Sequence, residues 1–254
     1  MPATADGYDY GQEWQSSFNG RRQTSAIPNE ISENDSDPMK SYFDSHTQGR
    51  GIWKWTHYFD IYHRHFSKFI GREVHVLEIG IYSGGSLTMW KEYFGQQCYV
   101  YGVDIEEACK VYADERTKIF IGDQQDRNFW TRIKPQIPLV DILIDDGGHE
   151  PEQQIATLEE MLPHLRPGGL YLCEDVHGSI NGFNSYLNGL TAQLNASVRK
   201  VHDKEKGIVC SPTQFQADIH SIHFYPFVTV IEKTHSPVAQ FAAPKHGTEW
   251  QPFL

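Results

Sequence analysis

The chain of 254 residues carries a formal net charge of −11 and is 39% hydrophobic, which is enough apolar material for a sizeable core and excludes wholesale disorder. Its acidic balance repels phosphate backbones and anionic lipids, so nucleic acid and membrane surfaces are poor candidate partners. No stretch approaches the roughly 20 apolar residues of a membrane span, and the first residues lack the basic and apolar regions of a signal peptide. The four cysteines show no close pairing, so we interpret them as reduced thiols and expect a cytoplasmic protein.

Composition divides the chain into three segments. Residues 1–40 are polar and lack a sustained period, which predicts a flexible arm or a lid that orders over a bound ligand. Residues 41–235 form the expected domain, and residues 236–254, with three prolines, are expected to be an irregular tail. Within the domain, residues 52–70 predict a helix packed on a sheet, because aromatic side chains recur every three or four positions. These are Trp55, Phe59, Tyr62, Phe66 and Phe69.

Strand-like and helix-like segments then alternate. The short apolar runs lie at 74–80, 98–104, 117–123, 140–146 and 168–175, and helix-like segments separate them. This alternation predicts βαβ units and a parallel sheet covered on both faces. Residues 218–233 contain two further runs joined by little more than Tyr225 and Pro226, which is too short for a crossover helix, so these strands should be antiparallel. The expected fold is therefore α/β: a Rossmann-like, seven-stranded, mostly parallel sheet with an antiparallel C-terminal strand pair.

Acidic residues end all five strands of the parallel series. In an open parallel sheet, ligands bind outside the carboxyl ends of the strands. One acidic strand end is ordinary, because Asp often caps the following helix, but five in series predict a cation or a ligand with many hydroxyls. The residues are Glu78, Asp104, Asp123, the pair Asp145 and Asp146, and the pair Glu174 and Asp175.

The turn after the first strand indicates a nucleoside site. It reads E-I-G-I-Y-S-G-G-S, and its glycines permit close backbone approach to a ligand at a helix N-terminus. The spacing differs from G-x-G-x-x-G, which disfavours a nicotinamide-dependent oxidoreductase, and Glu78 suits a cationic amino-acid moiety. Asp104 is expected to bind ribose hydroxyls, and Asp123 with Gln124 to contact an adenine edge. The expected cofactor-binding residues of the turn itself are Glu78, Gly80, Tyr82, Ser83 and Gly84.

The E-x-G-x-x-x-G turn, the acidic end of the second strand and the five-plus-two strand pattern resemble those of class I S-adenosylmethionine-dependent methyltransferases. The resemblance covers about residues 41–235. It implies S-adenosyl-L-methionine as the cofactor. A degenerate binding protein that keeps the nucleoside site without the chemistry is the alternative, and it would be expected to lose the acidic cluster.

The tips of the fourth and fifth strands predict a metal site. They read D-D-G-G-H, from Asp145 to His149, and C-E-D-V-H, from Cys173 to His177. Adjacent parallel strands lie about 4.8 Å apart, so the carboxylates should crowd together, and such a cluster raises its own pKa values unless a cation lies between its members. Oxygen ligands favour Mg²⁺, with Mn²⁺ or Ca²⁺ as alternatives, over zinc.

This pairing resembles the magnesium-dependent sugar O-methyltransferases of macrolide biosynthesis, of the mycinamicin type, and relatives known as cephalosporin hydroxylases. The resemblance implies that Asp146, Glu174 and Asp175 hold Mg²⁺ and that His149 is the general base. It also implies methylation of a sugar or polyol hydroxyl on a small natural product, and a homo-oligomer. The catechol methyltransferase pattern has an Asn in its metal set and fits less well.

Several structural alternatives remain open in the sequence. Asp145 and Asp146 could cap the following helix, with His149 in its first turn, and Glu174 with Asp175 could be a solvated strand end. Asp145 is expected either to face the cofactor or to orient a neighbour. His177 either touches the substrate or is an ordinary loop histidine. The aromatic segment from Trp53 to Tyr62, with the arm before it, is the expected lid.

Overall fold

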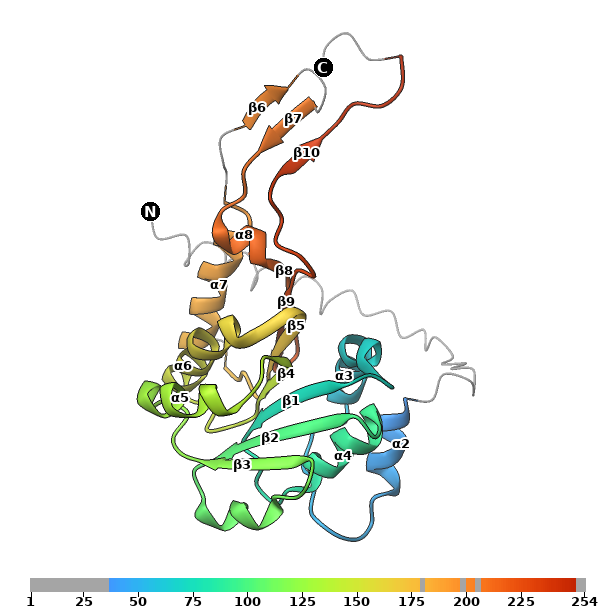
Figure 1. Ribbon diagram of the computed structural model, residues 1–254, viewed down its shortest axis with the longest axis vertical. Helices are drawn as coiled ribbons and strands as arrows, with labels where there is room; N and C mark the ends of the chain where they lie inside the picture. Colours follow the sequence, from blue (N-terminus) through green and yellow to red (C-terminus); the bar gives the residue numbers. More distant parts are fainter. Residues whose placement is uncertain (1–36, 179–180, 197–199, 204–206, 250–254) are drawn as a thin grey trace, which may run out of the picture. The chain divides into compact units, whose positions relative to one another are not determined.

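The computed structural model describes residues 37–178, 181–196, 200–203 and 207–249, so most of the predicted N-terminal arm lies outside the described residues. Seven strands form one sheet in the order β3-β2-β1-β4-β5-β9-β8 (Figure 1). The strands are β1 (Val74–Ile79), β2 (Cys98–Asp104), β3 (Thr117–Ile121), β4 (Val140–Asp145), β5 (Leu165–Cys173), β8 (Ile219–Tyr225) and β9 (Val228–Lys233). All neighbours up to β5 pair in parallel, whereas β9 is antiparallel to both β5 and β8. The predicted fold class is confirmed.

Helices cover both faces of this sheet (Figure 1). On one face lie α2 (Pro38–Ser45), α3 (Tyr58–Phe66) and α4 (Gly85–Phe94). On the other lie α5 (Arg127–Ile133), α6 (Pro151–Met161) and α7 (Gly182–Leu194). Every residue of β1 and β4 is buried, as expected for parallel strands between two helical layers, and both strands are mainly apolar in sequence. No helix in the described part of the chain is long and apolar enough to cross a membrane.

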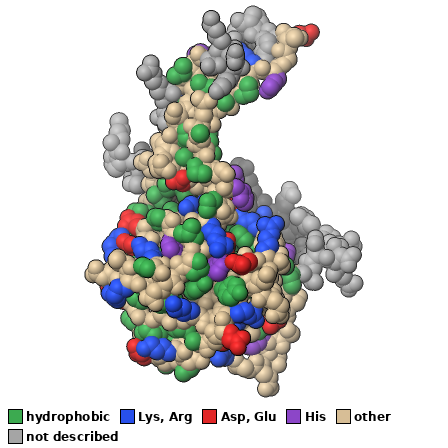
Figure 2. Space-filling view, in the orientation of Figure 1, with side chains coloured by type: hydrophobic (Ala, Val, Ile, Leu, Met, Phe, Trp, Pro, Cys, Tyr) green, Lys and Arg blue, Asp and Glu red, His purple; other side chains and the backbone are tan. Residues whose placement is uncertain are grey.

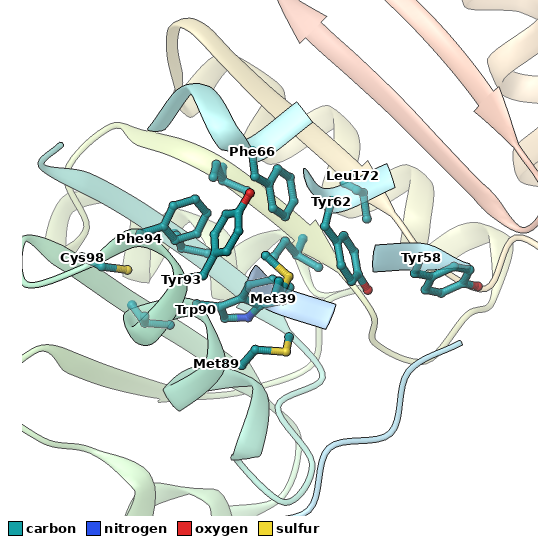
Figure 3. Packing of buried hydrophobic residues seen from close by; sticks show 14 of the residues in the cluster. Met39, Tyr58, Tyr62, Phe66, Met89, Trp90, Tyr93, Phe94, Cys98 and Leu172 are labelled. Carbon is teal, nitrogen blue, oxygen red and sulfur yellow. The ribbon is translucent and has the colours of Figure 1, made fainter. Parts of the chain in front are cut away.

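Aromatic packing fixes α3 against the sheet (Figure 3). Tyr62 stacks on Phe66 at 5.6 Å between ring centroids and meets Trp90 of α4 edge-on at 5.3 Å. All three side chains are fully buried, and each large apolar side chain contributes roughly 1.5–3 kcal/mol when it leaves water. This packing holds the hydroxyl-bearing face of α3 at a fixed distance from the strand ends.

The predicted helix over 52–70 begins later than its aromatic spacing indicates. The α-helix covers only Tyr58–Phe66 and continues as a 3₁₀ turn at Ser67–Phe69, so Trp55 lies before it. The preceding residues instead run close over the turn after β1, because a Cβ atom at Gly85 would lie 2.4 Å from the carbonyl oxygen of Gly51. This extended stretch carries the side chains of Lys54 and Trp55 toward the strand ends.

A second, three-stranded antiparallel sheet is present that the sequence did not predict. It consists of β6 (Lys200–Asp203), β7 (Gly207–Cys210) and β10 (Phe241–Ala243), in the order β10-β7-β6. β10 lies inside the segment expected to be an irregular tail. Hydrophobic side chains remain exposed over these strands, among them Val201, Ile208 and Phe241 (Figure 2).

Candidate active site

A cavity of about 1080 Å³ lies at the carboxyl ends of the parallel strands. Each of the five strands β1 to β5 supplies a residue to its wall, either at its last position or just beyond it. In chain order these residues are Gly80, Asp104, Asp123, Asp146 and Glu174. The predicted meeting of the acidic strand ends is therefore present in the fold.

The expected nucleoside residues divide into two groups. Five of them line the cavity: Gly80, Tyr82, Asp104, Asp123 and Gln124. Four are not part of its wall: Glu78, Ser83, Gly84 and Asp145. The carboxylate of Asp104 accepts hydrogen bonds from the backbone N–H groups of Tyr82 and Glu106, at 3.1 and 2.9 Å. These bonds orient the carboxylate and leave accepting capacity on both oxygens for hydroxyls of a ligand.

Asp145 is not part of the cavity wall, and of its two expected roles the observed contacts match the second, the orientation of a neighbour. Successive residues of a strand point to opposite faces, so Asp146 faces the cavity and Asp145 the helical layer behind it. The Asp145 carboxylate is buried, which raises its pKa to about 6, and it accepts hydrogen bonds from Gln124 Nε2 at 2.9 Å and the Tyr171 hydroxyl at 3.2 Å. Gln124 in turn accepts a hydrogen bond from the N–H of Gly148 at 2.9 Å. Asp145 and Gln124 thus brace the loop after β4.

Lys54 is the central cation of the site. Its side chain is only 4% exposed, and Nζ lies 2.6 Å from Asp146 Oδ2, 2.9 Å from Glu174 Oε2 and 3.8 Å from Glu78 Oε1. Burial alone would lower the pKa of Lys54, but these carboxylates outweigh it and raise the pKa above its ordinary value. The ammonium group therefore remains charged and supplies a counter-charge to three buried or half-buried carboxylates.

Two of the carboxylates around Lys54, those of Glu78 and Glu174, have raised pKa values. Burial, together with the charge of Asp146, raises the pKa of Glu174 to about 8, although Lys54 opposes the shift. Burial raises the pKa of Glu78 to about 7. Lys54 thus opposes the effect of burial on the pKa values of these two carboxylates without cancelling it.

Asp175 is held by a separate set of aromatic donors. Its Oδ1 accepts hydrogen bonds from Trp55 Nε1 at 3.0 Å and from the Tyr58 hydroxyl at 2.6 Å. The Tyr62 hydroxyl makes the equivalent bond to Glu174 Oε1, also at 2.6 Å. The two acids of the E-D pair are therefore fixed by one turn of α3 and the residues just before it.

The backbone around the cavity is unusual. Four non-glycine residues of the described chain adopt the left-handed conformation, in which a side chain is strained: Tyr82, His149, Asp175 and Phe227. The first three line the cavity, and the ring of Phe227 packs at 5.7 Å from Trp55 and 4.6 Å from His177. Strained backbone conformations of this kind are common at functional sites, where the surrounding structure maintains them.

His149 lies in the loop before α6 and not in the first turn of that helix, which corrects the expected placement. The helix begins at Pro151 with Glu150 as its N-cap, so neither Asp145 nor Asp146 caps it. His149 Nε2 lies 3.8 Å from Asp175 Oδ2, whereas its buried Nδ1 has no hydrogen-bond partner. His177 Nε2 lies 3.4 Å from Asp175 Oδ1. Both histidines line the cavity.

The donor set fits a divalent cation. Asp146, His149 and Asp175 each bring one ligand atom to within 4.8 Å of the others. Glu174 borders the same cavity, but both of its oxygens already accept hydrogen bonds from Lys54. The predicted set of Asp146, Glu174 and Asp175 therefore stays a prediction, in which Glu174 would share its oxygens between the metal and Lys54.

Comparison with known proteins relates this arrangement to a family. Residues 77–176, which include the glycine turn and the tips of β4 and β5, match a family model described as a methyltransferase domain. This matched segment, which is less than half of the chain, is called the methyltransferase domain below. The solved structure of the MycE methyltransferase from the mycinamycin biosynthetic pathway, in complex with Mg and SAH, matches with a TM-score of 0.61 and 28% identity. The match covers 77% of this chain and 53% of that one. It confirms the predicted resemblance to class I methyltransferases.

Curated relatives of the methyltransferase domain are named for sugar-bearing natural products. The 8-demethyl-8-alpha-L-rhamnosyl tetracenomycin-C 2'-O-methyltransferase of Streptomyces olivaceus is 31% identical over 73% of this chain and 52% of its own length. The demethylmacrocin O-methyltransferase of Streptomyces fradiae is 42% identical over 45% of this chain and 30% of its own length. The chain thus spans about half the length of these relatives or less.

Sequence reasoning missed the donors that hold the acidic tips of the methyltransferase domain. Lys54, Trp55, Tyr58 and Tyr62 all belong to the segment that is predicted to pack as a helix and to form a lid, and none of them is predicted to contact the acidic tips. A usable signal was present: Lys54 stands between two tryptophans in a chain whose five acidic strand ends require a counter-charge.

Proposed function

We propose that the methyltransferase domain transfers the methyl group of S-adenosylmethionine to a hydroxyl of a sugar or polyol, with a divalent cation at the strand-end carboxylates. The observation that carries this proposal is the shared cavity, which joins the ribose-type acceptor Asp104 to the group formed by Asp146, His149 and Asp175. The relatives support it: one is named for a rhamnosyl substrate, and MycE has been solved with Mg, SAH and mycinamycin VI together.

Two carboxylates would divide the binding of the cofactor, which supplies the methyl group when bound. Asp104 would accept hydrogen bonds from the ribose hydroxyls, since backbone N–H groups already orient it. Glu78 Oε2 accepts a hydrogen bond from Ser86 at 2.9 Å, but its buried Oε1 has no hydrogen-bond partner. Oε1 lies 3.8 Å from Lys54 Nζ, too far for a hydrogen bond, so it keeps accepting capacity for a cationic amino group of the ligand, although Glu78 is not itself part of the cavity wall.

The metal and the base would act on the acceptor hydroxyl. A divalent cation on Asp146 and Asp175, with Glu174 as the third predicted ligand, supplies a Lewis acid that lowers the pKa of a bound hydroxyl. His149, which lines the same cavity, would take up the released proton. Asp175 Oδ2, at 3.8 Å from Nε2, would then stabilise the imidazolium. Lys54, Tyr58 and Tyr62 hold the carboxylates in place throughout.

The segment before α3 would cover the reacting groups. Trp53 and Trp55 both line the cavity, yet they are 86% and 50% exposed. Large aromatic side chains left this exposed at a cavity mouth suit contact with the carbon-bearing face of a bound molecule. A ligand seated there would shield the transferred methyl group from water.

Ligand-dependent thermal unfolding tests the proposal before any acceptor is known. S-adenosylhomocysteine should raise Tm, because a ligand of the folded state alone stabilises it, whereas NAD should not. Mg²⁺ should bind independently of the nucleoside, as measured by calorimetry on protein stripped with EDTA. A rise in Tm with NAD would contradict the cofactor assignment. Binding of S-adenosylhomocysteine without any Mg²⁺ binding would favour the binding-protein alternative.

A further inference from the structure

A second cluster of metal-ligating side chains lies outside the cavity. It brings together His65 from α3, His223 from β8 and Glu232 from β9. None of the three lines the active-site cavity, and the proposed methyl transfer does not use them. β8 is the edge strand of the large sheet, so the cluster lies where α3 meets that edge.

The ligand atoms lie close to, but not yet at, the spacing of a tetrahedral site. His65 Nδ1 lies 3.4 Å from Glu232 Oε1, and His223 Nε2 lies 3.6 Å from Glu232 Oε2. One ligand atom of each residue lies within 4.8 Å of the other two. Zinc bonds of about 2.0–2.1 Å in tetrahedral geometry place neighbouring ligand atoms about 3.3 Å apart. Small side-chain rotations would therefore close the three ligands on one ion.

The outer contacts orient these ligands. His65 Nε2 lies 2.9 Å from the Tyr225 hydroxyl, so Nδ1 is the nitrogen directed at Glu232. A ligating histidine typically donates its other N–H to such an oxygen, which fixes the ring and its tautomer. The Ser221 hydroxyl lies 2.9 Å from His223 Nε2 and 3.3 Å from Glu232 Oε2, so it can remain bonded to the carboxylate when the imidazole binds an ion.

The cluster is accessible to an ion from one side, and one positive charge already lies beside Glu232. The His65 side chain is 4% exposed and that of His223 is 37% exposed, so the cluster is closed on the α3 side and open at the sheet edge. Lys68 Nζ now lies 3.1 Å from Glu232 Oε1, and its side chain is 38% exposed. An incoming dication would replace this flexible ammonium group, and water would complete the coordination.

We propose that His65, His223 and Glu232 form a binding site for a transition-metal dication of the Zn²⁺ type, separate from the active site. Two imidazoles and one carboxylate favour Zn²⁺ or Co²⁺ over Mg²⁺, which takes oxygen ligands. The ion would connect α3 to the β8–β9 edge. Because α3 also carries Tyr58 and Tyr62, it would stabilise the frame that holds the E-D pair without taking part in the reaction.

The test is a calorimetric Zn²⁺ titration of untagged, EDTA-stripped protein and matched variants. His223→Gln and Glu232→Gln remove one ligand each at positions that are not fully buried. Both should weaken Zn²⁺ binding by more than about 100-fold, since loss of an outer partner alone costs about 10- to 100-fold. Tyr225→Phe should weaken Zn²⁺ binding by only about 10- to 100-fold, because it removes an outer partner and not a ligand. His220→Gln, an exposed neighbour on β8, and His149→Ala, in the active site, should retain the wild-type affinity at this site.

Co²⁺ provides a second readout that does not depend on affinity. The wild-type protein should give the visible absorption of tetrahedral Co²⁺, and His223→Gln should lose it. No Zn²⁺ binding by the wild type, or equal binding by wild type and His223→Gln, would overturn the proposal. Binding that disappears only with His149→Ala would assign the ion to the active site and overturn it as well.

Discussion

Replacing Lys54 by Met removes the internal cation while keeping a side chain of similar length. Lys54 makes two close ion pairs, with Asp146 and Glu174, and it is 4% exposed. Breaking a buried pair by removing one partner typically costs about 3–5 kcal/mol, because the remaining charge is left without compensation. We expect a loss of this size in the free energy of unfolding at pH 8.5 in EDTA.

The same variant should change the pH dependence of stability. The pKa of Glu78 is raised to about 7 and that of Glu174 to about 8, so the folded protein holds protons that the unfolded chain has already released. Their contribution to stability is fully present below about pH 4.5 and is lost as the pH rises through 7–8. Without Lys54 both pKa values rise further, so stability should fall more steeply between pH 6 and pH 8.5. Protonation should offset part of the loss at pH 6.

Urea unfolding of the wild type and Lys54→Met at these two pH values measures both effects. Lys40→Met is the matched control, because its pair with Asp44 is an exposed contact within α2 and should contribute only about 0–1 kcal/mol. A Lys54→Met protein that loses no more stability than Lys40→Met, with the same change at both pH values, would refute the assignment of Lys54 as the counter-charge of the cluster.

Three further predictions concern ligands and turnover. Asp104→Ala should weaken S-adenosylhomocysteine binding by about 1.5–3 kcal/mol, measured by calorimetry, with little change in the Tm of the free protein. An unchanged affinity would contradict the proposed ribose site. EDTA should abolish methyl transfer to an accepted glycoside and leave S-adenosylhomocysteine affinity largely intact. Added Mg²⁺ should then restore activity. Full turnover after exhaustive chelation would argue against the metal. His149→Ala should lower kcat by about 10²–10⁴ if the imidazole is the base. Mg²⁺ titrations of the same variant distinguish whether His149 is a base or a metal ligand. Loss of a base leaves the Mg²⁺ affinity unchanged, whereas loss of a ligand lowers it, as Asp146→Asn should.

The sheet and its acidic edge could be predicted because both follow from local rules. A parallel strand buried on both faces appears as a short apolar run, and every parallel strand of one sheet ends at the same edge, so Asp104 and Asp146 could be assigned to one site without coordinates. The face toward which each member of the Asp145 and Asp146 pair points was less certain, because it depends on where β4 starts and ends.

The donors to that edge could not be predicted by the same rules. Lys54 meets Asp146 and Glu174 across 92 and 120 residues of sequence, and no periodic pattern records such a contact. The aromatic spacing of α3 also continues through Trp55, where the chain is no longer helical. The small second sheet could not be predicted from the sequence, because its strands are only three or four residues long, too short for an alternating hydrophobic pattern to show.

The division of the site between acceptors and donors has a consequence for local motion. The carboxylates that accept hydrogen bonds from the donors lie just beyond the ends of β4 and β5, whereas the donors Lys54, Trp55, Tyr58 and Tyr62 come from nine consecutive residues. If that segment lifted away by itself, it would leave Glu174 buried without its donors, so partial opening offers no stable intermediate. We therefore expect the amide protons of α3 to exchange with solvent through the same rare opening as those of β5, as one cooperative unit. Access to the cavity must then come from motions that leave α3 in place.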